Sequence, residues 1–203
     1  MLASKPGHPD AVFDAQSMPT FGPESDLFDV DPGLTTTKVN STHLLVLNRY
    51  CVFRPQYLIL TLDSYNRQTE PLYAPDFAAA WNVLHSSQLE HFVIYNCGPE
   101  VGCSRLHMHM QIPPKPKNFV FFPDVRPKKR KLVPYRYCLQ TLEDTLAKAD
   151  NAAKVLSDSY QELWSDARNL WQNAGEVDTG YFPHNVVLTK DWLVVVPRRR
   201  YGI

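Results

Sequence analysis

Short apolar runs alternate along the chain with turn-forming segments, and most of these runs predict strands. Ordered structure is expected to begin near Thr42, where HLLVLNRYCVF and QYLILTL predict two antiparallel strands joined at Arg54-Pro55. HFVIYNCG and RLHMHMQI predict two further strands on either side of the glycine-bearing turn GPEVGCS. NVVLTKDWLVVVPR predicts a last hairpin around a tight TKD turn.

Two other stretches carry apolar residues at helical spacing. PDFAAAWNVLHSSQ has Pro75 near its start and apolar residues from Phe77 to Leu84 on one face, which predicts a helix. Residues from about 141 to 172 carry apolar side chains three and four positions apart, which predicts one long or two shorter amphipathic helices. Roughly six strands in hairpins, without regular β-α alternation, predict an α+β fold with an antiparallel sheet and flanking helices.

Proline content and local composition divide the chain into an arm and a domain. Residues 1–41 are rich in Pro, Asp, Ser, Thr and Gly, so we expect an N-terminal arm that packs across the domain formed by residues 42–203. Residues 113–134 predict a proline-rich excursion that contains the basic run RPKKRK. This run could contact terminal phosphates or act as a nuclear address, although charge runs in loops are most often simply solvated.

Charge and cysteine content exclude several classes of protein. Lys+Arg and Asp+Glu both number 21, so bulk electrostatics gives no reason to expect a nucleic-acid partner. The four cysteines form no CxxC pair, which favours a reduced, intracellular protein without a structural zinc site. No segment approaches the roughly 20 apolar residues of a membrane span, so we expect a cytoplasmic or nuclear protein.

Strict alternation in RLHMHMQI separates an apolar face from a polar one. Because side chains on a strand alternate between its two faces, His107, His109 and Gln111 should project together. Valine or threonine would suit a strand better than two histidines and a glutamine, so this polar row indicates a function. The apolar row on the opposite face is Leu106, Met108, Met110 and Ile112.

The polar row fits nucleophilic attack on phosphorus. A neutral imidazole can attack a phosphate directly if a hydrogen-bond acceptor, such as a backbone carbonyl on the same strand, fixes the tautomer of its other nitrogen. Gln111 can donate its amide to a non-bridging phosphate oxygen without titrating. The preceding turn, with Gly98, Gly102 and Ser104, offers N–H groups and a hydroxyl. His107 and His109 could instead be metal ligands, although no third ligand stands at a recognisable spacing.

The segment GPEVGCSRLHMHMQIPP resembles the signature of the histidine triad superfamily, in which a GPE-x-G turn leads into His-x-His-x-His. Gln111 stands at the third place, as in the transferase branch of that superfamily. NRYCVFRPQYLILTLDSYNRQTEPL and HNVVLTKDWLVVVPR further resemble the fungal ATP adenylyltransferases, or diadenosine tetraphosphate phosphorylases. The resemblance implies a histidine-triad-like sheet and a nucleotidyltransferase that converts diadenosine tetraphosphate and phosphate to ATP and ADP.

The resemblance also implies roles for particular residues. His109 matches the nucleophile that forms a nucleotidyl-histidine intermediate, and His107, Gln111 and Ser104 complete the implied catalytic group. Nucleotide and phosphate are the implied partners, with no required cofactor, although a divalent cation could accompany the polyphosphate.

Substrate-binding positions follow from the same resemblance. Asn48 is implied to lie by the nucleoside ribose, and Asn96 and Gly102 to line the phosphates. Lys190, in the predicted hairpin turn, could reach a polyphosphate, although a solvated lysine is the equally common alternative. Phosphorylases of this kind are usually longer at both ends, so we expect part of the pocket to be missing or supplied differently here.

Three alternatives to the phosphorylase stay open. Water could replace phosphate as the acceptor, which would make the protein a dinucleoside polyphosphate hydrolase. A second alternative is a nucleotide-binding protein without catalytic activity. The third is a metal-dependent hydrolase that uses His107 and His109 as ligands.

Overall fold

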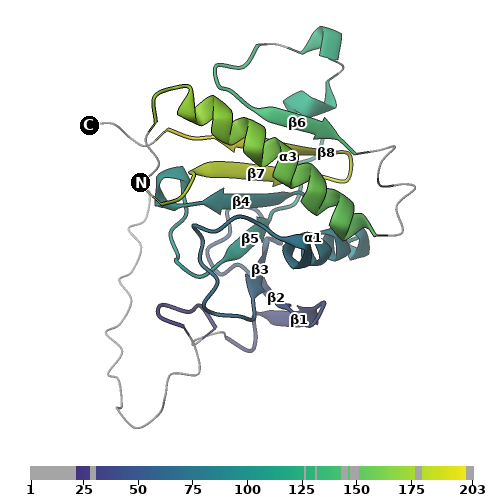
Figure 1. Ribbon diagram of the computed structural model, residues 1–203. Helices are drawn as coiled ribbons and strands as arrows, with labels where there is room; N and C mark the ends of the chain where they lie inside the picture. The colour runs from purple at the N-terminus through teal and green to yellow at the C-terminus, as the bar shows by residue number, and fades with distance from the viewer. Residues whose placement is uncertain are drawn as a thin grey trace, which may run out of the picture.

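The computed structural model describes residues 22–27, 31–125, 127–130, 132–142, 146, 151–176 and 180–199. Within these residues, eight strands form one sheet in the order β1-β2-β3-β5-β4-β7-β8-β6, and each neighbouring pair is antiparallel (Figure 1). The antiparallel α+β fold predicted from the sequence is therefore confirmed.

The strands and helices have the following bounds. The first half of the sheet comprises β1 (Thr35–Val39), β2 (His43–Leu47), β3 (Tyr57–Thr61), β4 (Val93–Cys97) and β5 (His109–Ile112). The second half comprises β6 (Cys138–Thr141), β7 (His184–Leu188) and β8 (Trp192–Pro197). The α-helices are α1 (Ala74–Ser86) and α3 (Ala152–Gln172), and short 3₁₀ turns are η1 (Pro99–Val101), η2 (Phe122–Asp124) and η3 (Pro127–Lys129).

The edge strands β1 and β6 were not predicted. β1 has the sequence TTTKV with four exposed positions, so it lacks the apolar alternation of a half-buried strand. β6 is a four-residue strand at the opposite edge of the sheet. The start of order expected near Thr42 is therefore too late, because β1 already pairs with β2. Residues 1–21 and 28–30 of the predicted arm lie outside the described residues, and the division into arm and domain stays a prediction.

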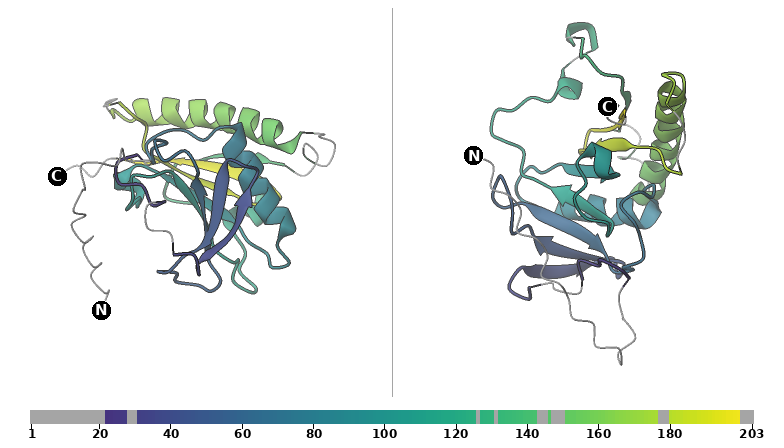
Figure 2. Two further views of the ribbon diagram at one scale, coloured as in Figure 1. Left: turned by 90° about the horizontal axis from the view of Figure 1, so that it is seen from below. Right: turned by 90° about the vertical axis from the view of Figure 1, so that its left-hand side faces the viewer.

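Both helices lie on one face of the sheet (Figure 2). α1 begins at Ala74 with Pro75 in its first turn, and Asp76 accepts a hydrogen bond from the backbone N–H of Tyr73 at 2.7 Å. In α3, the side chain of Asn151 caps the first turn by accepting from the N–H of Lys154 at 3.1 Å. The buried stripe of α3 contains Leu156, Tyr160, Leu163, Ala167 and Trp171. The predicted helix from about 141 to 172 is thus confirmed from Ala152 onward, whereas residues 143–145 and 147–150 lie outside the described residues.

The opposite face of the sheet is covered at one end by the predicted proline-rich excursion. The Phe121 ring packs edge-on against Trp192 of β8, with 5.4 Å between ring centroids, and Trp192 Nε1 donates to Asp124 at 2.7 Å. The register of β8, β7, β4 and β5 places the side chain of Trp192 on the same face of the sheet as those of Asn185 and Gln111. The excursion therefore shields the β8 end of the face that carries β5's polar row. Among the described residues, no helix is long and apolar enough to cross a membrane.

Candidate functional site

His109 begins β5, in the middle of the sheet. It stands opposite Leu60 of β3, the residue is 8% exposed, and its side chain lies on the face away from the helices. Its Nδ1 lies 2.9 Å from the backbone oxygen of His107. A carbonyl oxygen can only accept, so Nδ1 carries the proton and Nε2 of the neutral ring carries the lone pair. The sequence predicted a carbonyl on the same strand in this role, and the carbonyl that the structure provides lies two residues before β5.

His107 has a different environment from His109. Its ring is fully buried, its Nε2–H donates to the carbonyl oxygen of Thr61 at 2.9 Å, and its Nδ1 accepts from the N–H of Asp26 at 3.2 Å. Burial lowers the pKa of His107, and the nearby Asp26 carboxylate opposes that shift only in part. Both ring nitrogens are bonded inside the protein, so the geometry does not support a catalytic role in contact with substrate. His107 instead supports the strand and offers its carbonyl to His109.

The partner of His107 comes from the N-terminal segment 22–27. Gly22 N–H donates to Ser64 Oγ at 2.6 Å, and Arg67 donates to the carbonyl of Pro23 at 2.8 Å. A side chain at residue 22 would bring a Cβ to 2.6 Å from the backbone oxygen of Ser64, so this close approach requires glycine. Residues 22–27 of the predicted arm therefore contact the segments around Ser64, Arg67 and His107.

Gln111 lies on the same face as His109 and is oriented by Gln56. The amide nitrogen of Gln56 donates to Gln111 Oε1 at 3.1 Å. Because Oε1 accepts this bond, the NH₂ group of Gln111 points the other way, as donation to a phosphate oxygen would require. Asn48 adjoins Gln56 at the end of β2, where its N–H donates to the Gln56 carbonyl at 2.8 Å. The structure therefore brings Asn48 to the Gln111 side of the site.

Asn96 and Gly102 lie on the other side of His109. The register of β4 and β5 pairs Ile94 with Gln111, which places Asn96 level with His109 on the same face. Gly102, with φ of 95°, approaches the Asn96 amide, because a Cβ on it would stand 3.7 Å from that nitrogen. Asn185 of β7 joins them by donating to Asn96 Oδ1 at 2.7 Å and to the Val101 carbonyl at 3.2 Å.

Ser104 lies exposed in the connection from η1 to His107. The predicted alternation does not extend back through this connection, because Leu106 is 44% exposed instead of facing the core. Met108, Met110 and Ile112 are buried as predicted.

Lys190 is not close to this group of residues. β7 runs antiparallel to β4, with His184 opposite Cys97 at the site end and Leu188 opposite Val93 at the far end. Lys190 follows Leu188, so at about 3.3 Å per residue it stands roughly 16 Å along the strand direction from Asn185. This placement separates Lys190 from Asn96 and Asn185, and its contact with the polyphosphate stays a prediction.

Three buried or half-buried residues that organise the site were not predicted from the sequence. Gln56 orients Gln111, Asn185 holds Asn96, and Gln68 bonds the backbone of His109. The only sequence signal for them is polar side chains in or beside otherwise apolar strand segments, and Gln68 lacks even that because it lies in a turn-rich stretch. Within the described part of the chain, no group of three or more His, Cys, Asp or Glu residues could hold a metal ion.

Comparison with known families and proteins agrees with this geometry. A family model for the Ap4A phosphorylase N-terminal domain matches residues 15–121, and one for the ATP adenylyltransferase C-terminal domain matches residues 131–202. The diadenosine 5',5'''-P1,P4-tetraphosphate phosphorylase 2 of Saccharomyces cerevisiae is 29% identical over 181 residues, which are 76% of this chain and 54% of that protein. Protein APA1 of the same yeast is 27% identical, over 79% of this chain and 56% of its own length.

Solved structures show the same similarity. The crystal structure of yeast Ap4A phosphorylase Apa2 superimposes with a TM-score of 0.71 at 26% identity, over 85% of this chain and 64% of that one. Its complex with Ap4A gives a TM-score of 0.69 over 84% and 62% of the two chains, at 26% identity. The present chain thus spans a little over half the length of the yeast proteins that it matches in sequence. Because the first family model covers more than half of its residues, the chain belongs to the Ap4A phosphorylase N-terminal domain family.

Proposed function

We propose that this protein is a nucleotidyltransferase that uses inorganic phosphate to cleave diadenosine tetraphosphate into ATP and ADP. One observation carries the proposal: His109 Nδ1 is held 2.9 Å from the His107 carbonyl, so the nucleophilic lone pair is on Nε2. Gln111 and Asn96 flank His109 on the same face of the sheet, where their amides can bind the oxygens of a phosphate.

The first half-reaction forms an adenylyl-enzyme. His109 Nε2 attacks the phosphorus next to one adenosine, a P–N bond forms, and the P–O bond to the departing ATP breaks. The ring becomes cationic while Nδ1–H remains bonded to the His107 carbonyl, which stabilises that charge. The NH₂ group of Gln111 can donate to a non-bridging oxygen as negative charge builds up on it.

The second half-reaction returns the enzyme to its starting state. An oxygen of inorganic phosphate attacks the adenylyl phosphorus, the P–N bond breaks, and ADP leaves with its new P–O–P bridge. Nε2 recovers its lone pair, so His109 is ready for another substrate. With water as the acceptor the same step would release AMP, which is the hydrolase alternative.

The comparisons support adenine nucleotides as substrates. Apa2 of yeast has been solved with Ap4A and with AMP, and these two structures are 26% and 28% identical to this chain. AMP is the group that the proposed intermediate would carry on His109.

Product analysis tests the proposal. The protein is incubated with diadenosine tetraphosphate, with and without phosphate, and ATP, ADP and AMP are separated. We expect ATP and ADP in equal amounts, with formation of ADP dependent on phosphate. ATP with AMP at an unchanged rate in the presence of phosphate would make the protein a hydrolase, and no cleavage in either condition would contradict both.

We also propose that the reaction needs no resident cofactor, because an imidazole nucleophile and amide donors together supply the chemistry. A divalent cation is proposed only as a companion of the polyphosphate. Turnover that is lost in excess chelator should return when magnesium is added. Turnover that returns with zinc alone would instead favour a metal-dependent hydrolase.

A further inference from the structure

β4 and β5 separate at the level of the nucleophile. In the part of the chain that the structure describes, their ladder contains the single pair Ile94 and Gln111. If the ladder continued, Tyr95 and Met110 would form the next pair, and Asn96 and His109 the pair after that. The side-chain amide of Gln68 bonds both strands at this level instead, although Gln68 belongs to neither.

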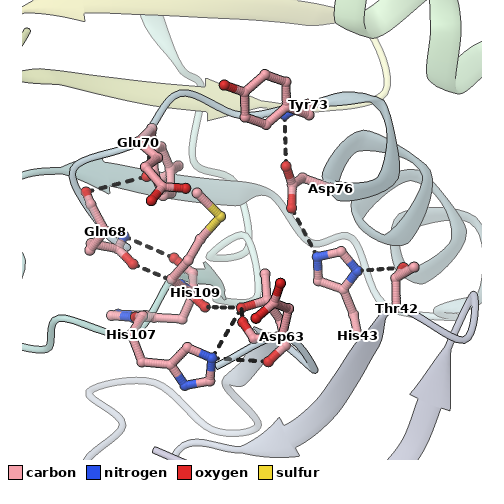
Figure 3. A network of polar contacts seen from close by, with 12 residues as sticks. Thr42, His43, Asp63, Gln68, Glu70, Tyr73, Asp76, His107 and His109 are labelled. Carbon is pink, nitrogen blue, oxygen red and sulfur yellow. Dashed lines mark hydrogen bonds and ion pairs between the residues drawn. The ribbon is translucent and has the colours of Figure 1, made fainter. Parts of the chain in front are cut away.

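The Gln68 amide bonds to the backbone on both sides of this gap, and Figure 3 shows its bonds to His109. Its Oε1 accepts from the N–H of His109 at 2.7 Å. Its Nε2 donates to the carbonyl of His109 at 3.0 Å and to the carbonyl of Asn96 at 3.0 Å. Gln68 is 1% exposed, so these bonds are shielded from competing water. A single side chain thus supplies bonds that a neighbouring strand would otherwise make.

Gln68 is itself fixed by its main chain. Its N–H donates to the Leu106 carbonyl at 2.9 Å, just before the active-site strand. Its carbonyl accepts from the N–H of Gly98 at 2.9 Å, just after β4. These bonds tie Gln68 to the chain on either side of the site, so its amide has a defined position from which to hold His109.

We propose that Gln68 is a positioning residue that sets the direction of the His109 imidazole by holding the His109 backbone. The proposal rests on the proposed function of His109 as nucleophile. The imidazole has two supports, the bond from Nδ1 to the His107 carbonyl and the backbone bonds to Gln68. Loss of the Gln68 amide would allow β5 to shift relative to β4. A displacement of about 1 Å in a reacting group can lower a rate about 100-fold.

The primary variant is Gln68→Met, which keeps the length and volume of the side chain but removes the donor and the acceptor. We expect kcat for phosphorolysis to fall about 10- to 100-fold while KM for diadenosine tetraphosphate changes less than about threefold. Thr189→Val is the matched control. Thr189 is a buried residue whose Oγ accepts from two backbone N–H groups in the distant β7–β8 turn, so its loss should weaken folding and leave kcat unchanged.

A double-mutant comparison separates positioning from a general structural role. In a His109→Gly background, free imidazole replaces the nucleophile and is not attached to the backbone that Gln68 holds. We therefore expect Gln68→Met to change the imidazole-rescued rate less than about threefold, although it lowers the rate of the intact enzyme much more. Equal losses in the two backgrounds would overturn the proposal.

A spectroscopic measurement tests the inference without relying on turnover. Nitrogen-15 NMR of the His109 ring should show the proton on Nδ1 in the wild type and a mixture of tautomers in Gln68→Met. If the Met variant does not fold, Gln68→Asn, which keeps a shorter amide, enters the same comparisons with an intermediate loss expected. Wild-type protein that cleaves no substrate would refute the proposed function alone. Unchanged kcat and an unchanged tautomer in a folded Gln68 variant would refute the positioning role alone.

Discussion

His109 and His184 make the same local hydrogen bond on two different faces of one sheet. His109 Nδ1 donates to the carbonyl two residues earlier, that of His107, at 2.9 Å. His184 Nδ1 donates to the carbonyl two residues earlier, that of Phe182, at 2.8 Å. In each neutral ring the lone pair is therefore on Nε2.

The two histidines differ in what lies beyond Nε2. His184, at the start of β7, faces the helices, is fully buried, and accepts from the hydroxyl of Tyr160 at 2.9 Å. Burial lowers the pKa of His184 to about 4. His109 lies on the opposite face, beside Gln111 and Asn96. The carbonyl bond sets the tautomer in both cases. Under the proposed function, the face of the sheet decides whether the lone pair meets a core tyrosine or a substrate.

The largest expected effect is on turnover at His109. His109→Ala removes the proposed nucleophile, so kcat should fall at least about 10⁴-fold. The free energy of unfolding should change by less than about 1 kcal/mol, because His109 supports little of the core. Initial rates and urea unfolding measure the two quantities. An alanine variant with the wild-type rate would show that His109 is not the nucleophile.

His184 should contribute to the loss of stability in acid. The unfolded chain protonates this ring near pH 6.5, whereas the folded chain does so only near pH 4. The contribution of the neutral His184 ring to the free energy of unfolding is therefore fully present above pH 6.5. It is lost as the pH falls towards 4, by about 3 kcal/mol for a shift of this size. Denaturant unfolding across this range should show that loss in the wild type.

The variant His184→Gln provides the reference for this pH experiment. Its amide can still accept from Tyr160 and donate to the Phe182 carbonyl, but it does not titrate. The acid-dependent loss should be smaller in this variant by about 3 kcal/mol, while kcat stays within about threefold of wild type. Parallel pH curves for the two proteins would show that His184 is not the titrating group.

A smaller effect is expected from the partner of His184. Tyr160→Phe removes the hydroxyl that donates to His184 Nε2 and leaves the ring of residue 160 in the core. The cost should be about 1 to 2 kcal/mol of unfolding free energy, with no change in kcat. Thermal or urea unfolding beside a standard rate assay measures both. A loss of turnover without a loss of stability would connect the buried pair to catalysis.

The smallest effect is expected at Lys190. The β7–β8 turn stands at the far end of β7 from Asn185, so Lys190→Ala should leave both KM and kcat within about twofold of wild type. Steady-state kinetics at low ionic strength, where a long-range charge effect would be strongest, checks this. A tenfold rise in KM would instead indicate that Lys190 contacts the polyphosphate, as the sequence first suggested.

Local patterns predicted the parts of this site that lie on one strand. Alternation placed His109 and Gln111 on one face and Met108 and Met110 in the core, and the carbonyl bond of His109 spans only two residues. The edge strands β1 and β6 lacked that alternation and were missed.

Contacts between distant parts of the chain were not predictable. Gln68 reaches His109 across 41 residues, and Asp26 reaches His107 across 81. Neither partner lies in a periodic segment, so no spacing along the chain pointed to them. The position of Lys190 was not predictable for a related reason: its distance from Asn96 depends on which end of β7 lies beside that residue, and this follows from the strand order of the whole sheet.

Mass spectrometry of the intact protein tests the central claim most directly. Wild-type protein is mixed with diadenosine tetraphosphate in the absence of phosphate, quenched at neutral or alkaline pH to protect a P–N bond, and digested to locate any adduct. We predict one adenylyl group on His109, lost on addition of phosphate with release of ADP, and absent from His109→Ala. Rapid phosphorolysis by wild-type protein with no adenylyl adduct, or with the adduct on another residue, would contradict the account.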